Sequence, residues 1–397
     1  MKTWIQIFCD ELELVYQDKS ILLTCLVAPL LYAFFVGSIY EEKDVFDIPI
    51  AVVDMDHSNL SRKVVQLIDT HEKVSVNGTS SNLNDAMYEF NNLQVQGILL
   101  IPPGFERTTL RLEGSTLQLF LNNTKFLTSN EVNKGIQEVI LTVSAGIRMN
   151  YLISSKVPEN LALEQAQPIM PSIRSIYNTT NNYGDYLLPI LLILIIQQTL
   201  IIGFGQSVIH SIKTDGLFSS SQVSTVDLFR IFSAKGAYYL LLYASFFFLF
   251  YKLIFPYYHL VFQGSFALHF ALSTLFVLAV IIFTLLLASF FKTTIGWTEI
   301  MAFSTYPLFL VSGYSWPLEA MPAALRYFAQ LLPSTPYFEM FNRLSMQGAS
   351  FWEIKDAFNH LILLILLGVC SLIIRFQWII KKQKKQIESE NLADLKH

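Results

Sequence analysis

A long polar segment, Glu41 to Tyr186, separates the first strongly apolar stretch of this chain, Ile21–Ile39, from the second, Leu187–Val208. After the second stretch the sequence stays almost continuously apolar. A helix needs about 20 mostly apolar residues to cross the roughly 30 Å hydrocarbon core of a bilayer. The pattern therefore predicts one membrane anchor, a sizeable polar domain and then a cluster of spanning helices. The domain is expected on the opposite side of the membrane from the N-terminus.

The composition supports the membrane class. Hydrophobic residues make up 53% of the chain and charged residues only 15%, whereas a soluble domain carries about 25% charged residues. The three cysteines are Cys9, Cys25 and Cys370. None lies within residues 41–186, so that domain is expected to fold without disulfides. The net charge of −4 is spread over segments that face different compartments and identifies no partner.

Counting apolar stretches of sufficient length predicts six spanning helices. The fifth is interrupted by Pro307 and closed by Gly313. The predicted fold class is a polytopic α-helical membrane protein with a mixed α/β extracytoplasmic domain. The predicted spans are Ile21–Tyr40, Leu187–Val208, Ala237–Phe255, Phe266–Phe290, Ile300–Val311 with its flanks, and Leu361–Ile380.

Lysine and arginine gather in segments that share one face if six spans are correct, and such residues favour the cytoplasmic side. These residues are Lys2, Lys19, Lys213, Arg230, Lys235, Lys292, Arg375, Lys381, Lys382, Lys384 and Lys385. Both termini are therefore predicted to be cytoplasmic. The predicted divisions are an interfacial helix (1–19), the first span (20–40), the extracytoplasmic domain (41–186), five further spans (187–380) and a cytoplasmic tail (381–397).

Residues 1–18 are predicted to form an amphipathic helix in the cytoplasmic interface. Apolar residues recur at helical spacing at Trp4, Phe8, Leu12 and Val15. The other faces are polar, with Asp10, Glu11, Glu13 and Gln17. A soluble helix packed on a partner protein is the alternative interpretation.

The polar domain shows mixed α/β patterning. Apolar runs predict strands, and periodic segments predict helices. The strands are Ile48–Val53, Gln96–Ile101 and Thr116–Leu121, and the helices are a segment capped by Ser58, Asn84–Leu93 and Ser129–Val157. Asp54, Asp56 and His57 are clustered enough for a metal site to be conceivable. The favoured interpretation is a strand-to-helix turn, in which Asp and Ser supply turn geometry and N-caps.

The sequence contains no G-x-x-x-x-G-K-[ST] motif, so it predicts no P-loop, and any ATP used would be bound by another chain. No hydrolase signature such as G-x-S-x-G is present either. No catalytic residues, no cofactor and no nucleic-acid partner are therefore expected.

Polar residues are few within the predicted spans. They are Gln197, Gln198 and Thr199 in the second and Ser304, Thr305 and Tyr306 in the fifth. A buried amide or hydroxyl in hydrocarbon needs a partner, so such residues tend to face the bundle or a cavity. Two interpretations stay open: these residues line a translocation path, or they form hydrogen bonds between helices.

The segment after the fifth span reads S-G-Y-S-W-P-L-E-A-M-P, followed by a predicted short helix, Ala323–Leu332, and by P-S-T-P. Gly and Pro stop the preceding helix. This segment is therefore predicted to lie at, or dip back into, the external interface. Its marker residues are Gly313, Pro317, Met321, Pro322, Pro333 and Pro336.

In this segment, with Ser312 at its start, the chain resembles the transmembrane subunits of type-2 ABC exporters, whose extracellular re-entrant segment carries an S-G-x-x-x-P-x-x-x-M-P … P-x-x-P pattern. The resemblance covers essentially the whole chain. The N-terminal helix looks like the family's elbow helix. Ile48–Ser61 and Gly97–Glu106 look like the start of the external domain in the branch with a large external domain.

The resemblance implies an ATPase-coupling loop after the second span, with Ser220–Arg230 as the docking helix. This loop departs from the family pattern of an acidic-basic pair before Gly-Thr, since it reads K-T-D-G-L-F. The residues implied as coupling contacts are Lys213, Asp215, Gly216, Leu217, Phe218, Asp227 and Arg230.

The resemblance implies a permease subunit of an ATP-driven exporter in the cell (inner) membrane, with drugs, lipids or other amphipathic molecules as cargo. The implied partners are a separate ABC ATPase, a second permease subunit in a homodimer or heterodimer, the lipid bilayer and a periplasmic adaptor. The alternative is a non-transporting receptor or scaffold whose external domain binds a ligand or a cell-envelope partner. A membrane-bound enzyme ranks last, because no catalytic constellation is present.

Overall fold

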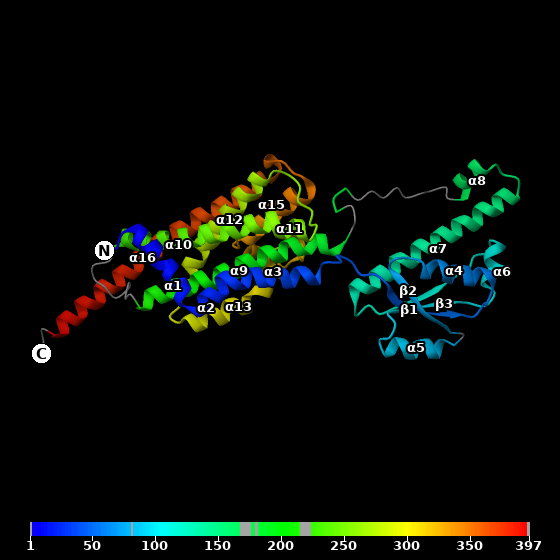
Figure 1. The fold of residues 1–397 in the computed structure, drawn as a ribbon, viewed down its shortest axis with the longest axis horizontal. Coiled ribbons are helices and arrows are strands. Elements are labelled where there is room, and N and C mark those ends of the chain that lie inside the picture. Colours follow the sequence, from blue (N-terminus) through cyan, green and yellow to red (C-terminus); the bar gives the residue numbers. More distant parts are fainter. Residues whose placement is uncertain (1, 81, 167–175, 179–181, 215–223, 395–397) are drawn as a thin grey trace. The chain divides into compact units, whose positions relative to one another are not determined.

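The computed structural model (Figure 1) describes residues 2–80, 82–166, 176–178, 182–214 and 224–394. The chain divides into two compact units, each with its own hydrophobic core. We call Met1–Lys43 together with Ser175–His397 the helical unit, and Asp44–Arg174 the sheet unit.

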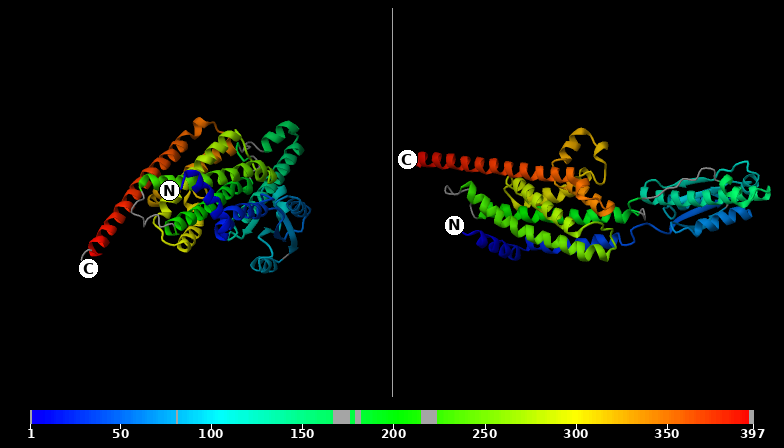
Figure 2. Two further views of the ribbon diagram at one scale, coloured as in Figure 1. Left: turned by 60° about the vertical axis from the view of Figure 1, so that its left-hand side comes forward. Right: turned by 90° about the horizontal axis from the view of Figure 1, so that it is seen from above.

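The helical unit begins with α1 (Trp4–Gln17) and ends with α16 (Lys355–Asp394). The first turn of α1 and the last turn of α16 lie at the same end of this unit (Figures 1 and 2). The helices between them are α2 (Lys19–Leu22), α3 (Ala28–Ile39), α9 (Tyr183–Thr214), α10 (Thr225–Leu249), α11 (Phe255–Tyr257), α12 (Phe266–Ala288), α13 (Thr294–Val311), α14 (Ala323–Ala329) and α15 (Ser334–Gln347).

Five helical segments in the described part of the chain are long and apolar enough to cross a membrane. Helix α13, the predicted fifth span, is not among them. It has 18 residues, about 27 Å at 1.5 Å per residue, and it contains Glu299 and Pro307. The predicted fifth span, and with it the total of six, therefore stays a prediction. The five segments are Lys19–Ile39, Tyr183–Lys213, Thr225–Tyr257, Phe266–Ala288 and Phe351–Lys382.

Helix α9 is the central helix of the helical unit. In its most apolar window 83% of the residues are buried, against 28% in the first span and 17% in the last. It contacts α3, α10, α12 and α13. Side chains on α9 are therefore surrounded by protein, whereas most apolar side chains of α3 and α16 are exposed on the surface of the unit, where lipid could cover them.

The sheet unit is built on a four-stranded sheet in the order β2-β1-β3-β4. Strands β1 (Ile48–Asp54), β2 (Val74–Ser80) and β3 (Gly97–Ile101) are parallel, and β4 (Gln118–Leu121) is antiparallel to β3. The helices of this unit are α4 (Asn59–Asp69), α5 (Leu83–Asn91), α6 (Phe105–Leu110), α7 (Phe126–Ser154) and α8 (Glu159–Ala166).

Side chains of the strands alternate between two cores, one on each face of the sheet. Ile50 and Val52 face a core that includes Val64 of α4 and Val132 of α7. On the other face, Ala51, Val53, Ile98 and Leu100 pack with Ala86 of α5. Helices α4 and α7 thus cover one face and α5 covers the other (Figure 1).

Most elements predicted between residues 48 and 157 are confirmed, with shifts at their ends of at most a few residues. Strand β2 was missed. Val74–Ser80 reads V-S-V-N-G-T-S, which carries little of the apolar signal of a strand because β2 lies at the edge of the sheet. The pairing with β1 also skips Asn77, where the register shifts between Ile50 and Ala51.

Helix α15 was also missed, because Pro333 was interpreted only as the end of the short helix before it. Instead both prolines begin a helix: Pro333 is its N-cap, and Pro336 lies in its first turn, where a missing N–H costs nothing.

Candidate functional site

The predicted path residues of α9 are buried, and one of them joins α9 to α13. The Gln198 amide nitrogen donates to the carbonyl oxygen of Met301. Ser304 Oγ donates to the same carbonyl at 2.8 Å, and Thr305 Oγ1 donates to Ala302 O at 2.9 Å. The Gln198 bond is of the helix-to-helix kind that the sequence left open as the alternative to a path, whereas Ser304 and Thr305 bond within α13.

Two amide oxygens in this region have no partner. Gln197 Oε1 and Gln198 Oε1 are buried without a hydrogen bond to any described residue. Leaving such an acceptor unpaired in an apolar medium costs about 1–3 kcal/mol. Thr199 is also buried and satisfies its hydroxyl on Ile195 O at 2.8 Å, while Tyr306 is 67% exposed on the surface of the unit. The role of these residues in a path stays a prediction.

The segment after α13 contains the predicted stop signals. Gly313 has φ +89°, a left-handed conformation that favours glycine, and a Cβ there would meet Leu318 at 2.8 Å. Pro317 precedes a 3-10 turn, Leu318–Ala320, which ends at Met321, and Pro322 is the N-cap of α14. Helix α14 ends at Ala329, three residues earlier than predicted, and α15 begins at Ser334. Whether this segment is re-entrant stays a prediction.

A tyrosine pair attaches this segment to the start of α9. The rings of Tyr186 and Tyr314 stack with centroids 4.7 Å apart, and Tyr186 Oη donates to Tyr314 O at 2.6 Å. Tyr314 Oη donates in return to Tyr186 O. Burial raises the pKa of Tyr314 well above its usual range, so its hydroxyl stays a donor.

The predicted coupling loop is described only at its two ends. Lys213 lies in the last turn of α9, and Asp215, Gly216, Leu217 and Phe218 lie outside the described residues. Ser224 and Asp227 form a capping box at the start of α10, and Arg230 pairs with Asp227 at 3.1 Å. From Ser224 onward, the predicted docking helix is therefore the first turns of α10 rather than a separate helix.

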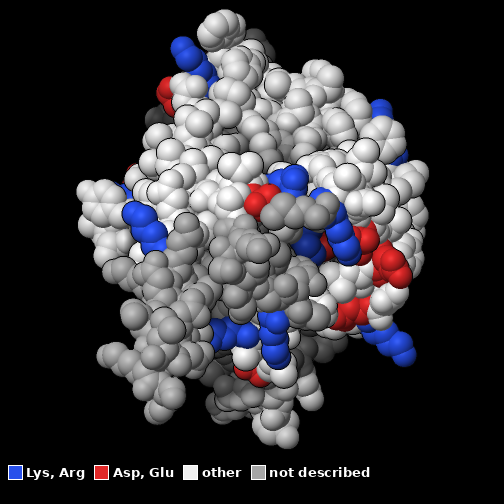
Figure 3. Space-filling view, turned by 90° about the vertical axis from the view of Figure 1, so that its left-hand side faces the viewer, with Lys and Arg blue, Asp and Glu red and all other residues white. Residues whose placement is uncertain are grey.

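Charged side chains of both signs lie among mostly uncharged ones on the end of the helical unit that carries the start of α1 (Figure 3). Lys2 and Asp10 form an exposed ion pair at 2.8 Å in this region of the chain. Such a surface is typical of a water-exposed end of a membrane protein.

A buried charged group joins α1 to α9 and α10, and the sequence interpretation missed it. Glu11, which was placed on a polar face of α1, is 1% exposed. Its carboxylate pairs with the ammonium group of Lys235 on α10 and accepts a hydrogen bond from Ser207 Oγ on α9. Lys235 Nζ also donates to Ser207 Oγ at 3.2 Å. We call these three residues the Glu11 node.

The face that α1 buries explains the error. Its buried residues are Ile7, Glu11 and Val15, at i, i+4 and i+8, while Trp4 and Leu12 of the predicted apolar face stay exposed. A signal was present in the sequence: Lys235 lies at the start of an apolar stretch, where an opposite charge from another segment is needed.

In the sheet unit, the predicted turn after β1 has the expected structure. Asp54 Oδ1 accepts from the backbone N–H groups of Asp56 and His57, both at 3.0 Å, and Ser58 caps α4. Asp56 accepts from the N–H groups of Gly104 at 2.7 Å and Glu106 at 3.0 Å, at the start of α6. These aspartates therefore act as caps. Among the residues described, no group of three or more His, Cys, Asp or Glu could hold a metal ion.

The caps shift the pKa of Asp56. Burial by itself raises it, but hydrogen bonds from Ser58 and from the backbone N–H groups of Glu106, Gly104 and Phe105 outweigh burial and lower the pKa below its ordinary value.

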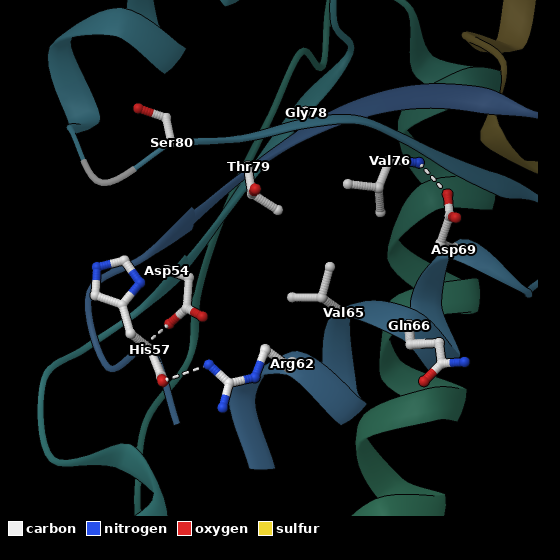
Figure 4. A pocket seen from close by; sticks show the side chains of 10 residues that line it. All are labelled: Asp54, His57, Arg62, Val65, Gln66, Asp69, Val76, Gly78, Thr79 and Ser80. Carbon is white, nitrogen blue, oxygen red and sulfur yellow. Dashed lines mark hydrogen bonds between the residues drawn. The ribbon is translucent and has the colours of Figure 1, made fainter. Parts of the chain in front are cut away.

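A groove of about 590 Å³ runs between α4 and β2 in the sheet unit (Figure 4). Val65 and Val76 lie in its middle part. Arg62 and Thr79 lie toward one end, and Asp69, whose carboxylate accepts from Val76 N at 2.8 Å, lies at the other. Arg62 is held by bonds to His57 O and Asn59 Oδ1. Because β2 is an edge strand, this groove lies next to the edge of the sheet.

These features define a class: a bundle of membrane-spanning helices, a buried polar link to an N-terminal helix and a separate α/β unit. Residues 19–376 match the family described as ABC-2 family transporter protein. The chain belongs to this family. It is a multi-pass membrane protein and a permease component of an ABC transporter, and the family in general works with an ABC ATPase. Comparison with curated proteins gives no match.

Proposed function

We propose that this chain is the transmembrane permease subunit of an ATP-driven exporter. A separate ATPase supplies the energy, and two permease subunits, identical or different, form the path. The cargo is a drug, lipid or other amphipathic molecule. The chain lies in the cell (inner) membrane with both termini in the cytoplasm and the sheet unit outside.

The observation that carries this proposal is the Glu11 node. Ser207 lies on α9 six residues before Lys213, and Lys235 lies on α10 five residues after Arg230. The node therefore attaches α1 to both helices that flank the predicted coupling loop. A charge pair buried this well resists separation, because leaving one charge buried without the other costs about 3–5 kcal/mol. A push on the loop would consequently move α1, α9 and α10 together.

The proposed translocation path involves α9, one of the helices that the Glu11 node joins. Motion of α9 relative to α13 would change the Gln198 contact with Met301, and the unpaired oxygens of Gln197 and Gln198 could then accept from polar groups of cargo. In this mechanism the energy of ATP hydrolysis is used to expose and cover these acceptors in turn.

The experiment is capture of the ATPase. A photo-reactive residue at Leu217 or Phe218, in the predicted coupling loop, is activated in native membranes and the product is identified by mass spectrometry. The expected product contains a P-loop ATPase. The matched control carries the same residue at Tyr88, an exposed position of the sheet unit, and is expected to capture no ATPase. Abundant, intact protein that captures no ATPase from several positions of the loop would contradict the proposal.

The groove between α4 and β2 favours a second candidate, a receptor or scaffold whose sheet unit binds a ligand or a cell-envelope partner. Within the exporter, the same unit would instead bind a periplasmic adaptor or the sister subunit. Deletion of residues 41–186 distinguishes two roles of the sheet unit within the exporter. If the unit binds a partner, export is lost and ATPase capture is retained. If the unit is needed for assembly, both export and ATPase capture are lost.

A further inference from the structure

Helix α16 lies along one side of the helical unit, and one of its faces is exposed over most of its apolar length (Figure 2). Leu363, Leu367, Ile374 and Trp378 are exposed at helical spacing, Ile374 by 68% and Trp378 by 52%. Residues at this spacing lie on one face of a helix. In a multi-pass membrane protein, lipid chains cover an exposed apolar face of this length. We call these four residues the lipid face of α16.

The lipid face continues directly into exposed lysines at the end of the span, which is Lys382. Lys381 comes three residues after Trp378, so it lies on the same face. Lys382 Nζ is 5.3 Å from the centroid of the Trp378 ring. Lys384 and Lys385 follow in the sequence. Since tryptophan is enriched where a span leaves the hydrocarbon, this end of the lipid face is at the level of the lipid head groups.

Arg375 lies at the same end of the unit, where it contacts helix α12. Its Nη2 donates to the carbonyl oxygen of Ser289 at 2.8 Å, and its Nε donates to Ser289 Oγ at 3.2 Å. Ser289 is the C-cap of α12, so α12 ends at this level too. The guanidinium carbon is 4.1 Å from the centroid of the Phe290 ring. A guanidinium has five N–H donors, so Arg375 keeps donors for a further acceptor.

We call Arg375, Lys381 and Lys382 the basic end of α16. Within the part of the chain that the structure describes, no ion pair joins any of these three residues to a carboxylate. Asp227, at the start of the neighbouring helix α10, pairs instead with Arg230 at 3.1 Å. The three positive charges therefore have no anionic partner among the described side chains.

We propose that the basic end of α16 binds the phosphate of an anionic phospholipid, such as phosphatidylglycerol. The acyl chains of the lipid pack on the lipid face, and its phosphate accepts hydrogen bonds from Arg375, Lys381 and Lys382. A zwitterionic lipid binds less well, because its own amine compensates the phosphate charge. The occupant is a lipid rather than a soluble phosphate, because the charges continue a face that lipid chains already cover. This inference does not depend on the exporter function.

The contacts of Arg375 give such a lipid a structural role. Because Arg375 contacts Ser289 of α12 and the lipid phosphate together, one bound lipid holds the ends of two helices at the same level of the membrane. The planar guanidinium also suits phosphate better than an ammonium does. Each lysine or arginine near an anionic membrane surface raises affinity by a factor of about five.

The experiment uses the full-length protein in nanodiscs of phosphatidylcholine that contain a trace of phosphatidylglycerol with a photo-reactive group next to its head group. The protein is illuminated, and the labelled peptides are mapped by mass spectrometry. Label is expected in the segment around Trp378 and Lys381. Unlabelled phosphatidylglycerol is expected to compete at least tenfold better than added phosphatidylcholine with the same acyl chains.

Substitutions test the named charges. Replacing both exposed lysines, with Lys381→Gln and Lys382→Gln together, is expected to weaken competition by phosphatidylglycerol about 25-fold, and Arg375→Gln to weaken it about fivefold. Gln377 is exposed one turn before Lys381, so Gln377→Lys adds a cation beside the site and is expected to strengthen binding about fivefold. A misfolded variant could not show this gain.

The matched control is Lys252→Gln. Lys252 is an exposed lysine whose Nζ also lies over an aromatic ring, 4.2 Å from the centroid of Phe266. It lies near the far end of the span Thr225–Tyr257, whose start contacts α16 through Phe229. Labelling of the α16 segment is therefore expected to stay unchanged in this variant.

The outcomes distinguish a bound anionic lipid from its alternatives. Preferential labelling by phosphatidylglycerol that is lost in the double lysine variant supports the site. Equal competition by phosphatidylcholine, with labelling unchanged in the double variant, means that lipid covers this surface without recognition of charge, and it overturns the proposal. Displacement of the label by millimolar inorganic phosphate as effectively as by phosphatidylglycerol identifies a soluble anion as the ligand and also overturns it.

Discussion

The junction of β1 and α4 in the sheet unit and the central helix α9 of the helical unit both contain buried polar groups, but in different positions along their elements. In the sheet unit, Asp54 and Ser61 lie at the junction of β1 and α4, where they cap and close a turn. In the helical unit, some buried polar side chains also lie at element ends, as Asp185 and Ser334 do, but others lie in the middle of a helix: Gln198, Gln206 and Ser207 project from the central helix α9. Polar groups at element ends stabilise a scaffold, whereas polar groups in the middle of a buried helix need partners from other helices and can change them.

The first prediction concerns the Glu11 node. Glu11→Gln or Lys235→Met leaves one buried charge without its partner, so each is expected to lower the free energy of unfolding by about 3–5 kcal/mol. The double variant is expected to recover a large part of that loss. Thermal unfolding of the purified protein provides the double-mutant cycle.

The exposed pair Lys2–Asp10 is the control for this cycle, since surface pairs contribute about 0–1 kcal/mol. If Glu11→Gln costs no more than Asp10→Asn, the node does not join α1 to the bundle, and the distinction between the units loses its strongest example.

The second prediction tests whether the sheet unit is a separate scaffold. Ile50 is fully buried among α4 and α7 residues, so Ile50→Ala is expected to destabilise the sheet unit by about 2–5 kcal/mol. Protection of the sheet-unit backbone from hydrogen exchange should fall, while that of α9 and α12 should stay unchanged. Equal loss in both units would mean that they unfold as one.

The third prediction compares one substitution in the two units. A Cβ at Gly205 of α9 would meet Trp297 at 2.2 Å, whereas a Cβ at Gly146 of α7 would meet nothing within 4 Å. Gly205→Ala is expected to destabilise by about 1–3 kcal/mol through overpacking. Gly146→Ala is expected to stabilise by about 0.5–1 kcal/mol, because alanine favours a helix over glycine. Melting temperatures that shift in the same direction would contradict the close packing of α9.

The smallest expected effect belongs to Asp56. Its pKa is lowered in the folded state, so the ionised form contributes stability above the unfolded pKa of about 3.9, and this contribution is lost as the pH falls through the folded value. Asp56→Asn is therefore expected to cost about 1 kcal/mol at pH 7 and progressively less below about pH 4. Denaturant unfolding at several pH values measures this difference.

Glu164→Gln, on the exposed surface of α8, serves as the control for this pH series. A cost of Asp56→Asn that does not change with pH would show that the carboxylate charge is not what caps α6.

The sequence predicted the elements of the sheet unit well where they are buried and poorly where they are not. Strands β1 and β3 are apolar throughout because both faces are covered, so their pattern is strong. Strand β2 lies at the edge and carries mostly polar residues, and no pattern marks it. In the helical unit, the length of continuous apolar segments predicted six spans, and five of them largely fall within segments that are long and apolar enough to cross a membrane. The predicted fifth span, α13, is not apolar enough to be among them.

The sequence indicated which types of residue could have a function, but it did not indicate which other residues they would contact. Gln198 was expected to face the bundle or a cavity, and its partner, the carbonyl oxygen of Met301 on α13, could not be named from the sequence. Asp215, Gly216, Leu217 and Phe218 lie outside the described residues, so their coupling role stays a prediction.

The sequence by itself determined that this protein is a multi-pass membrane protein with an inserted α/β unit. Membrane insertion depends on the length and polarity of continuous segments, which are properties of the chain read in one dimension. Only the tertiary structure decided that Glu11 is buried. Glu11 and Lys235 are 224 positions apart. A buried charge depends on which distant side chain packs against it, and local pattern does not contain that information.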